Sequence, residues 1–208
     1  MRSPWAREYV RTSKAYIWGT ESSPLAREAS ALLLDRGRVI DLGCGEGRDS
    51  VFFAAQGFEV TGVDVSAAGL RKAQRLARER GVAARWLQGD MARLRFEGPF
   101  DLVYSCGAIH YVPRRDRARL LVRLKACTRP DGYHAFIVFT GSAIYVEKGE
   151  VIDYFEPGEL ARAYADWVIL RCAEGEIACA QDGVPHHHSV QEFVVKRPGA
   201  PGREEGDE

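Results

Sequence analysis

The sequence RVIDLGCGEGRDS, residues 38–50, predicts a strand, a glycine-rich turn and the start of a helix. An apolar strand-like segment encloses Asp41, and Gly43, Gly45 and Gly47 follow at alternate positions. Glycine at such a turn permits positive φ and lets a ligand approach main-chain N–H groups that a Cβ would shield. We therefore interpret the turn as a ligand-binding loop.

The glycine spacing excludes two common phosphate-binding loops. A dinucleotide loop of the G-x-G-x-x-G type needs glycine where this chain has Arg48, and no Gly-Lys-Ser/Thr follows, as a P-loop requires. Asp41 also places a carboxylate where the pyrophosphate of a dinucleotide would lie. The loop therefore favours a ligand with a cationic group, such as S-adenosylmethionine, which carries an ammonium and a sulfonium.

Composition favours one soluble α/β domain that acts on a small molecule. The chain has 208 residues, 46% apolar and 28% charged, with a formal net charge of zero, so no global field attracts nucleic acid or anionic lipid. Its five cysteines lack a C-x-x-C pair, and no apolar run has the length of a signal peptide or a membrane span. We expect a cytoplasmic protein with reduced cysteines, no nucleic-acid partner and no membrane anchor.

Strands and helices alternate along the first two thirds of the chain. This order predicts β-α-β units and a parallel sheet with helices on both faces. The predicted strands are 39–42, 58–63, 85–88, 100–105 and 133–139, with helices at 24–34, 51–55, 66–81 and 114–127 and a turn at 130–132. A loop containing Glu147, Lys148 and Glu150 follows, then a helix over 156–165 and strands 167–180 and 188–196, joined by a hairpin at 181–185 that makes the last strand antiparallel.

The predicted domain covers residues 1–197. Residues 1–20, rich in aromatic side chains, are expected to form an N-terminal cap, and residues 198–208 a disordered tail. Ligands of parallel sheets bind beyond the carboxyl ends of the strands. Because Asp41, Asp64, Asp90 and Ser105 all stand at such ends, the sequence predicts a site along one edge.

Four motifs in this order resemble class I S-adenosylmethionine-dependent methyltransferases. They are VIDLGCGEG at 39–47, VTGVDVS at 60–66, QGDM at 88–91 and FDLVYS at 100–105. The resemblance covers residues 15–197 and implies a Rossmann-like, seven-stranded, mostly parallel sheet, with an antiparallel last strand beside the fifth strand and helices on both faces. It also implies S-adenosylmethionine as cofactor and S-adenosylhomocysteine as product.

Within this class the chain is most similar to the tellurite-resistance methyltransferases. The similarity lies in GRDS at 47–50, TRPDGY at 128–133 and FEPGELARAYADW at 155–167. The best-known members carry a His-Arg pair and a further Arg on the last hairpin, where the matching residues here are Ala178, Cys179 and His186. This departure puts the identity of the substrate in doubt.

The class resemblance also implies roles for individual residues. The three glycines would pass under the methionine part, Asp64 would accept both ribose hydroxyls, Asp90 and Met91 would hold the adenine, and Ser105 would lie near the sulfonium. One carboxylate can indeed accept two hydrogen bonds from a diol. The expected cofactor-binding residues are Trp18, Asp41, Gly43, Cys44, Gly45, Gly47, Asp64, Val65, Asp90, Met91 and Ser105. For Trp18, packing on the helix over 24–34 is an open alternative.

Four residues are candidates for acting on the methyl acceptor. Arg48 follows the glycine loop and could bind an anion, although a salt bridge to a neighbouring carboxylate is equally consistent with its position. His110 follows the fourth strand, and packing is its alternative. His186 and His188 would share one face of the last strand by alternation and could bind an oxyanion or take a proton, with a solvated hairpin as the alternative. We expect no metal, because His-x-His supplies only two ligands.

The expected reaction is in-line methyl transfer to a small molecule, with a chalcogen oxyanion such as tellurite or selenite as the suggested acceptor. A small organic thiol, amine or hydroxyl is one alternative, and a non-catalytic S-adenosylmethionine-binding protein is another. A nucleic-acid methyltransferase is disfavoured by the neutral charge and by Ser-Cys-Gly-Ala at 105–108, where amino-methylating members carry a proline-containing motif. A monomer or homodimer is expected.

Overall fold

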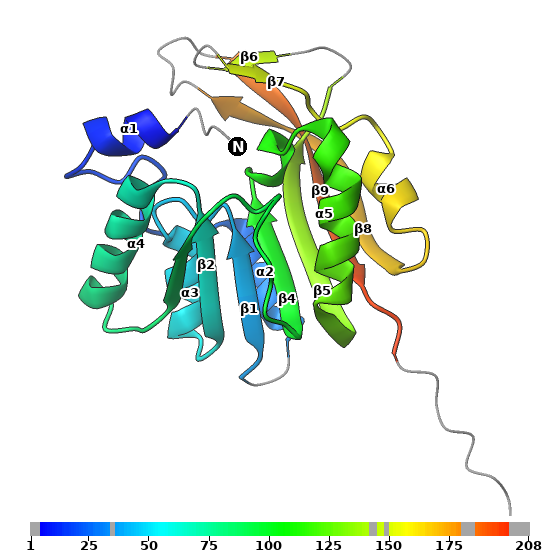
Figure 1. Ribbon diagram of the computed structural model, residues 1–208, viewed down its shortest axis with the longest axis horizontal. Helices are drawn as coiled ribbons and strands as arrows, with labels where there is room; N and C mark the ends of the chain where they lie inside the picture. Colours follow the sequence, from blue (N-terminus) through cyan, green and yellow to red (C-terminus); the bar gives the residue numbers. More distant parts are fainter. Residues whose placement is uncertain (1–4, 34–35, 142–144, 148–149, 180–185, 200–208) are drawn as a thin grey trace, which may run out of the picture.

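A seven-stranded sheet forms the centre of the computed structural model, which describes residues 5–33, 36–141, 145–147, 150–179 and 186–199 (Figure 1). The strand order is β3-β2-β1-β4-β5-β9-β8. The strands are β1 (Arg38–Leu42), β2 (Glu59–Asp64), β3 (Arg85–Gln88), β4 (Phe100–Cys106), β5 (Thr128–Phe139), β8 (Val168–Cys179) and β9 (His186–Lys196). β9 is antiparallel to both of its neighbours, β5 and β8, whereas the pairs among β1 to β5 are parallel. The predicted fold class is therefore confirmed, including the inserted last strand.

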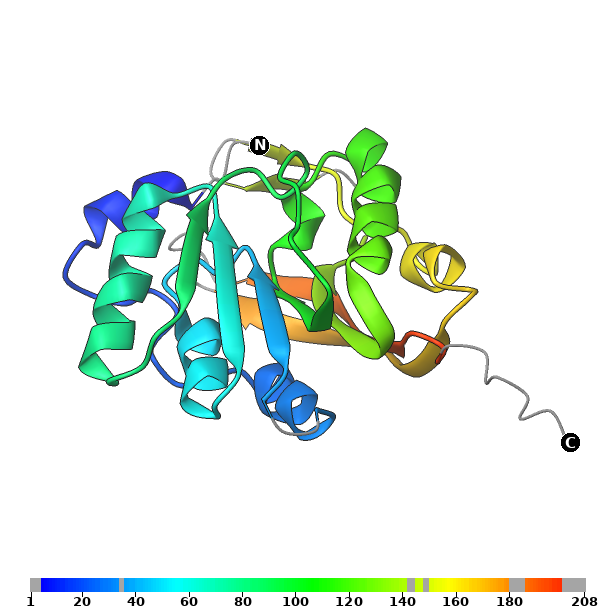
Figure 2. The ribbon, with the colours of Figure 1, turned by 60° about the horizontal axis from the view of Figure 1, so that its bottom comes forward.

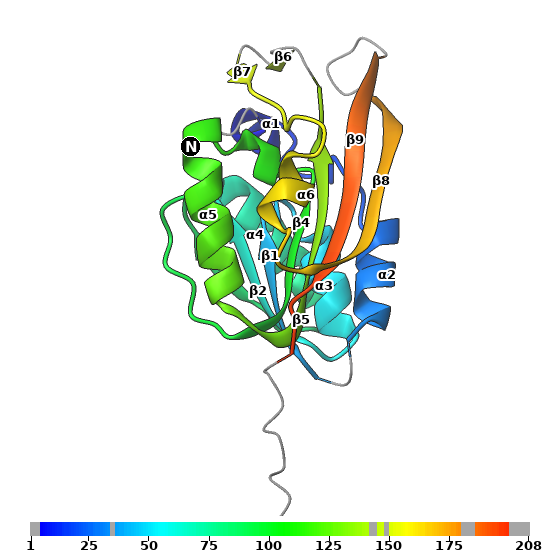
Figure 3. The same cartoon turned by 90° about the vertical axis from the view of Figure 1, so that its right-hand side faces the viewer.

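Helices cover both faces of the sheet (Figure 3). They are α1 (Ala6–Arg11), α2 (Pro24–Ala31), α3 (Arg48–Ala55), α4 (Ala67–Glu79), α5 (Arg114–Ala126) and α6 (Glu159–Ala163), with a 3-10 turn η1 (Ile109–Tyr111). The two faces bury separate apolar clusters, because successive strand residues point to opposite sides. On β4, for example, Leu102 joins the cluster with α2, whereas Val103 joins the cluster with α5 and α6.

Helix starts follow the expected capping chemistry. The Ser23 hydroxyl accepts the Ala26 N–H at 3.1 Å and Pro24 opens α2, while the Ser66 hydroxyl accepts the Gly69 N–H at 3.2 Å at the start of α4. None of the helices in the described ranges combines the length and apolar character needed to cross a membrane.

Two local predictions were wrong. The turn expected at 130–132 does not precede a strand but lies inside β5, where Phe100 pairs with Thr128 and Leu102 with Tyr133. The chain accommodates the extra residues as a bulge with Asp131 at φ 62°, and the Gly132 carbonyl still accepts a hydrogen bond, from the Arg197 N–H at 2.8 Å. Pro-Asp-Gly therefore bends the strand without ending it.

The segment predicted as a loop after Phe139 contains two short strands. β6 (Tyr145–Glu147) pairs antiparallel with β7 (Glu150–Ile152) in a separate two-stranded sheet above the carboxyl ends of the main strands (Figure 1). Three-residue strands carry too little alternation to be recognised from sequence. Lys148, the hairpin at 181–185 and most of the predicted tail, residues 200–208, lie outside the described residues.

The N-terminal segment, residues 5–18, lies beside α4 (Figure 2). Trp5 and Tyr9 are buried and pack with Ala68 of α4. Residues of this segment and of strands β8 and β9 line one cavity. They enclose the space in which the predicted site residues meet.

Candidate functional site

A cavity of about 450 Å³ lies at the carboxyl ends of the central strands. Its walls come from the glycine loop, the end of β2, the turn after β4, the N-terminal segment and the β8–β9 hairpin. The predicted site residues that line it are Trp18, Asp41, Gly43, Cys44, Gly45, Arg48, Asp64, Val65, Met91 and His188. The volume suits a cofactor-sized ligand.

The glycine loop owes its shape to two close approaches. Gly43 has φ 75°, and a Cβ there would lie 2.1 Å from the Ala108 Cβ. Gly47 has φ 83°, but a Cβ there would meet Ala73 of α4 at 2.5 Å. Gly47 is the N-cap of α3 and does not line the cavity, and the absence of a side chain there lets α3 pack closely against α4.

Asp64 is the last residue of β2, and its side chain binds the backbone of the glycine loop. One carboxylate oxygen accepts the Gly45 N–H at 2.9 Å, and the other accepts the Ser66 N–H at 2.7 Å. The side chain is only 8% exposed, and this burial raises the pKa of Asp64 above its ordinary value. Each oxygen has a second lone pair, so the carboxylate can still accept two hydroxyl groups from the cavity side.

Asp41 is the most perturbed carboxyl group of the site. Burial and then the neighbouring Asp49 raise the pKa of Asp41 to about 7, against the effect of the Ser50 hydroxyl, which donates to it at 2.5 Å. A cation in the cavity would offset the cost of burying this charge. The arrangement is consistent with the cationic ligand that the loop predicts.

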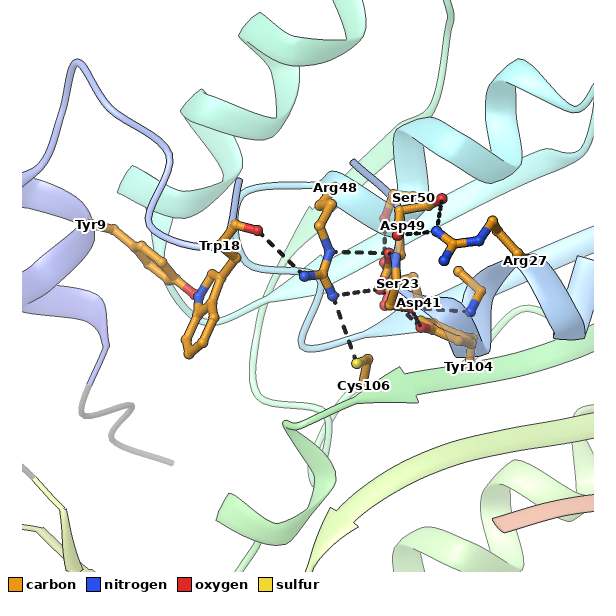
Figure 4. Close-up of polar contacts among 12 residues, drawn as sticks. Tyr9, Trp18, Ser23, Arg27, Asp41, Arg48, Asp49, Ser50, Tyr104 and Cys106 are labelled. Atoms are coloured by element: carbon orange, nitrogen blue, oxygen red, sulfur yellow. Dashed lines mark hydrogen bonds and ion pairs between the residues drawn. The ribbon is translucent and has the colours of Figure 1, made fainter. Parts of the chain in front are cut away.

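Arg48 forms an ion pair with Asp49 (Figure 4). Its Nε and Nη2 donate to the two carboxylate oxygens at 3.2 and 3.1 Å. Asp49 also accepts the Ser23 N–H at 2.7 Å and the Tyr104 hydroxyl at 2.9 Å. Burial would lower the pKa of Arg48, but Asp49 outweighs this effect and raises it. Of the two readings of Arg48, the salt bridge is therefore confirmed, and its charge is already compensated.

Aromatic side chains of the N-terminal segment line the cavity. The Trp5 indole donates to the Tyr111 hydroxyl at 2.8 Å, the Trp18 indole donates to the Tyr9 hydroxyl at 3.2 Å, and the two indole rings meet edge to face at 4.7 Å. Tyr16 instead lies on α4, where Arg75 donates to its hydroxyl at 3.1 Å. Of these two neighbouring aromatic residues, only Trp18 lines the cavity.

His188 and His110 lie on opposite sides of Phe139. Both imidazoles stack on this ring, His188 at 4.4 Å and His110 at 4.2 Å between centroids, and two rings cannot occupy one face. His188 lines the cavity and lies 3.4 Å through Nδ1 from the Tyr154 hydroxyl. His110 does not line it, and burial followed by Arg117 holds the pKa of His110 well below its ordinary value. The predicted substrate contact by His110 is thus not supported.

Other predicted residues stand outside the cavity. Ser105 is fully buried, donates to the Leu42 carbonyl at 2.8 Å and does not line the cavity, whereas its neighbour Cys106 does. Asp90 accepts the Ala92 N–H at 2.9 Å and does not line the cavity. For His186 the structure describes the backbone, which pairs with Cys179, and not the side chain.

Sequence reasoning missed several lining residues. Glu46 is 1% exposed and bound to Lys72 of α4, which no pattern in the sequence connects with the loop. Trp5 and Phe139 also line the cavity, but the sequence placed them only within the N-terminal cap and the fifth strand. Among the described lining residues Arg48 is the only Arg or Lys, and its partner is Asp49. The other charged lining groups are carboxylates, so the cavity favours cations and neutral molecules over anions.

The central part of the chain is similar to a known protein domain. Residues 39–132 match the family model of a methyltransferase domain. The ubiquinone biosynthesis O-methyltransferase of Rickettsia felis is 30% identical over 94 residues, which is 45% of this chain and 38% of that protein. The chain spans about half the length, or less, of the curated relatives it matches first.

Two solved structures share the fold. TehB from Haemophilus influenzae has a TM-score of 0.76 at 18% identity, covering 87% of this chain and 64% of that chain. The 1,6-didemethyltoxoflavin-N1-methyltransferase of Burkholderia thailandensis, with bound 1,6-didemethyltoxoflavin and S-adenosylhomocysteine, has a TM-score of 0.64 at 24% identity, covering 95% and 92%. At these identities the likeness establishes a common fold.

Proposed function

We propose that this chain is a class I S-adenosylmethionine-dependent methyltransferase that methylates a small, uncharged organic molecule; the methyltransferase-domain match over residues 39–132 and the shared fold support the class. The supporting observation is that acidic and apolar side chains line different parts of the cavity. Carboxylates gather at the glycine loop and the end of β2, whereas the wall formed by Ile137, Phe139 and Ile177 is apolar. The protein is expected to act in the cytoplasm. It would be a single domain that forms a monomer or a homodimer.

The acidic end of the cavity suits the methyl donor. Asp41 would face its cationic methionine part, Asp64 would accept the ribose hydroxyls, and Val65 and Met91 would flank the adenine. Asp64 supports this role because Gly45 and Ser66 already orient its carboxylate. When bound, S-adenosylmethionine supplies an electrophilic methyl carbon on a sulfonium sulfur that leaves with the bonding electrons as S-adenosylhomocysteine.

The apolar end favours a neutral acceptor over an oxyanion. An anion buried there would need an uncompensated cation or several donors to replace its hydration. Arg48 is committed to Asp49, and Cys106 remains a neutral thiol because burial raises its pKa to about 12. The resemblance to tellurite-resistance methyltransferases makes tellurite or selenite the second candidate acceptor, which the same assay tests.

The chain's contribution to methyl transfer is positioning and proton removal. Closed aromatic and apolar walls exclude water and align the nucleophile with the methyl carbon, so its lone pair forms the new bond as the carbon–sulfur bond breaks. A thiol or hydroxyl acceptor also loses a proton, and His188 is the cavity group placed to take it. Tyr154 would orient the His188 ring through Nδ1.

The His188 assignment gives the first prediction. At pH 7, His188→Gln should lower kcat for thiol and hydroxyl acceptors by about 10²-fold, the usual contribution of a general base. Cofactor affinity and turnover of an amine that enters uncharged should change little, because such an amine can attack before it loses a proton. A panel of thiols, phenols, amines, tellurite and selenite with radiolabelled methyl donor measures both effects.

His187→Gln is the matched control, because His187 is the exposed neighbour of His188 on the same strand. Full activity of His188→Gln on every acceptor would remove the histidine from the mechanism. Efficient methylation of tellurite alone would replace the organic acceptor with the oxyanion. Cofactor binding without any methylated product would instead identify a non-catalytic S-adenosylmethionine-binding protein.

A second prediction concerns pH. Because the pKa of Asp41 is about 7 in the free protein, this carboxyl group is neutral below that pH and ionised above it. A cationic ligand prefers the ionised form, so affinity for S-adenosylmethionine should rise by up to about tenfold per pH unit on approaching pH 7 from below, then level off. Calorimetric titration from pH 5.5 to 8.5 should show this rise. Asp41→Asn should flatten it, and an unchanged profile in that variant would contradict the assignment.

A further inference from the structure

A buried ion pair joins the glycine loop to α4 beneath the N-terminal segment. The carboxylate of Glu46 binds the ammonium of Lys72 through Oε1, and the two side chains are 1% and 4% exposed. Glu46 lies between two loop glycines and lines the cavity, whereas Lys72 comes from the middle of α4. The pair therefore links the ligand-binding loop to an element outside the cavity.

Both partners also bind the N-terminal segment. The second carboxylate oxygen of Glu46 accepts the backbone N–H of Ile17 at 2.8 Å and that of Trp18 at 3.2 Å. Lys72 donates to the hydroxyl of Thr12 at 3.1 Å, and its ammonium lies 5.6 Å from the centre of the Tyr9 ring. One buried pair thus attaches the segment at three points along its length.

This attachment determines part of the cavity wall. The N-terminal segment supplies Trp5, Tyr9 and Trp18 to the lining, and Trp18 lies beside Arg48, whose Nη1 donates to its carbonyl at 3.4 Å (Figure 4). Trp18 is 38% exposed, so it stands at the border between cavity and solvent. If the backbone of residues 17 and 18 left Glu46, this wall would open.

A charged pair at this position is not explained by stability alone. Replacing a buried ion pair by apolar side chains of similar size is often neutral or stabilising, because burial of both charges costs solvation. Glu46 offers something that an apolar side chain lacks, namely an acceptor for two main-chain N–H groups that would otherwise be unpaired in the closed segment. Lys72 keeps that acceptor in place and compensates its charge.

We propose that Glu46 and Lys72 are positioning residues that hold the N-terminal segment closed over the cofactor. The inference rests on the proposed function for the identity of the cofactor. Beyond that function, it identifies the part of the protein that must move before the cofactor can leave. Release requires residues 17 and 18 to detach from Glu46. The acceptor, by contrast, enters a cavity whose aromatic wall is complete only while this attachment holds.

Two double variants separate the hydrogen bonds from the charges. Glu46→Gln with Lys72→Met keeps a carbonyl oxygen for the two N–H groups, whereas Glu46→Leu with Lys72→Met removes it; both leave no buried charge. We expect the leucine variant to release S-adenosylhomocysteine at least about tenfold faster than wild type, since each lost hydrogen bond is worth a factor of about five. The glutamine variant should stay within about threefold. Stopped-flow displacement followed by tryptophan fluorescence measures the rates.

A second measurement needs no ligand. Arg11 and Lys14 are exposed on the N-terminal segment, so trypsin should cut there faster in the leucine variant than in the glutamine variant at equal thermal stability. Arg71→Met is the control, because Arg71 is an exposed residue of α4 next to Lys72. This variant should match wild type in both assays. Mass spectrometry of the released N-terminal fragment identifies the cut.

The outcomes distinguish this inference from the proposed function. Equal release rates and equal trypsin cleavage in the two double variants, with both folded, would overturn the positioning role. Failure of the wild type to bind S-adenosylhomocysteine would overturn the proposed function, while the cleavage comparison would still decide whether Glu46 and Lys72 hold the segment.

Discussion

Replacing Gly43 by alanine is expected to lower cofactor affinity by at least about 10²-fold and to destabilise the fold by about 2–4 kcal/mol. Two costs combine at this position. The backbone has φ 75°, which an L-residue with a side chain disfavours, and the new Cβ would lie 2.1 Å from the Ala108 Cβ. Because the loop cannot move without displacing its neighbours, the ligand-facing N–H groups should shift with it.

Gly57→Ala is the matched control for this change. Gly57 has φ 91°, but nothing lies within 4 Å of an added Cβ, so only the backbone cost of about 1–2 kcal/mol applies. The double variant Gly43→Ala with Ala108→Gly removes the clashing methyl and should recover much of the loss. Urea unfolding and calorimetric titration measure the two quantities. A Gly43→Ala protein that behaves like Gly57→Ala would show that the close approach has no consequence.

Asp64→Asn should lower affinity for S-adenosylhomocysteine by about 10²–10³-fold while the protein stays folded. The ionised carboxylate can form two charge-assisted hydrogen bonds with the ribose, each worth about 1.5–3 kcal/mol. An amide keeps one oxygen, but its NH₂ group would face the N–H of Gly45 or Ser66, both of which now donate to Asp64. The loop should therefore also lose order.

Asp90→Asn provides the comparison, because Asp90 lies at the end of the next strand without lining the cavity. Its effect on affinity should be smaller, within about tenfold, since at most one charge-assisted bond is weakened. Calorimetry with S-adenosylhomocysteine, together with thermal unfolding of each variant, separates binding from stability. Unchanged binding in Asp64→Asn would refute the ribose assignment.

The sheet could be predicted because its signals are local and repeated. Alternating strands and helices imply parallel pairing, and the Asp-Gly hairpin before β9 implies its antiparallel direction. The carboxyl ends of β1 and β2 then bring Asp41 and Asp64 to one edge, where both line the cavity. Such predictions need only the two-residue alternation of side chains along a strand and the right-handedness of β-α-β connections.

The errors share a different cause. At the end of β4, Ser105 was expected at the site, but the cavity is lined by Cys106, because a shift of one residue in a strand moves a side chain to the other face. His110 is adjacent in sequence to Tyr111, which lines the cavity, yet its own ring lies behind Phe139. Strand ends and short turns do not carry enough periodicity to determine which way a single side chain points.

By itself, then, the sequence determined the class of sheet, the glycine loop and the edge at which a cationic cofactor can bind, because spacing along the chain is enough for each of these. Only the tertiary structure decided what surrounds that loop. The pairing of Glu46 with Lys72, the compensation of Arg48 by Asp49 and the stacking of His188 on Phe139 join residues from different elements. Whether a charge is compensated or a side chain faces the cavity depends on these long-range contacts, so the acceptor preference could be argued only once they were known.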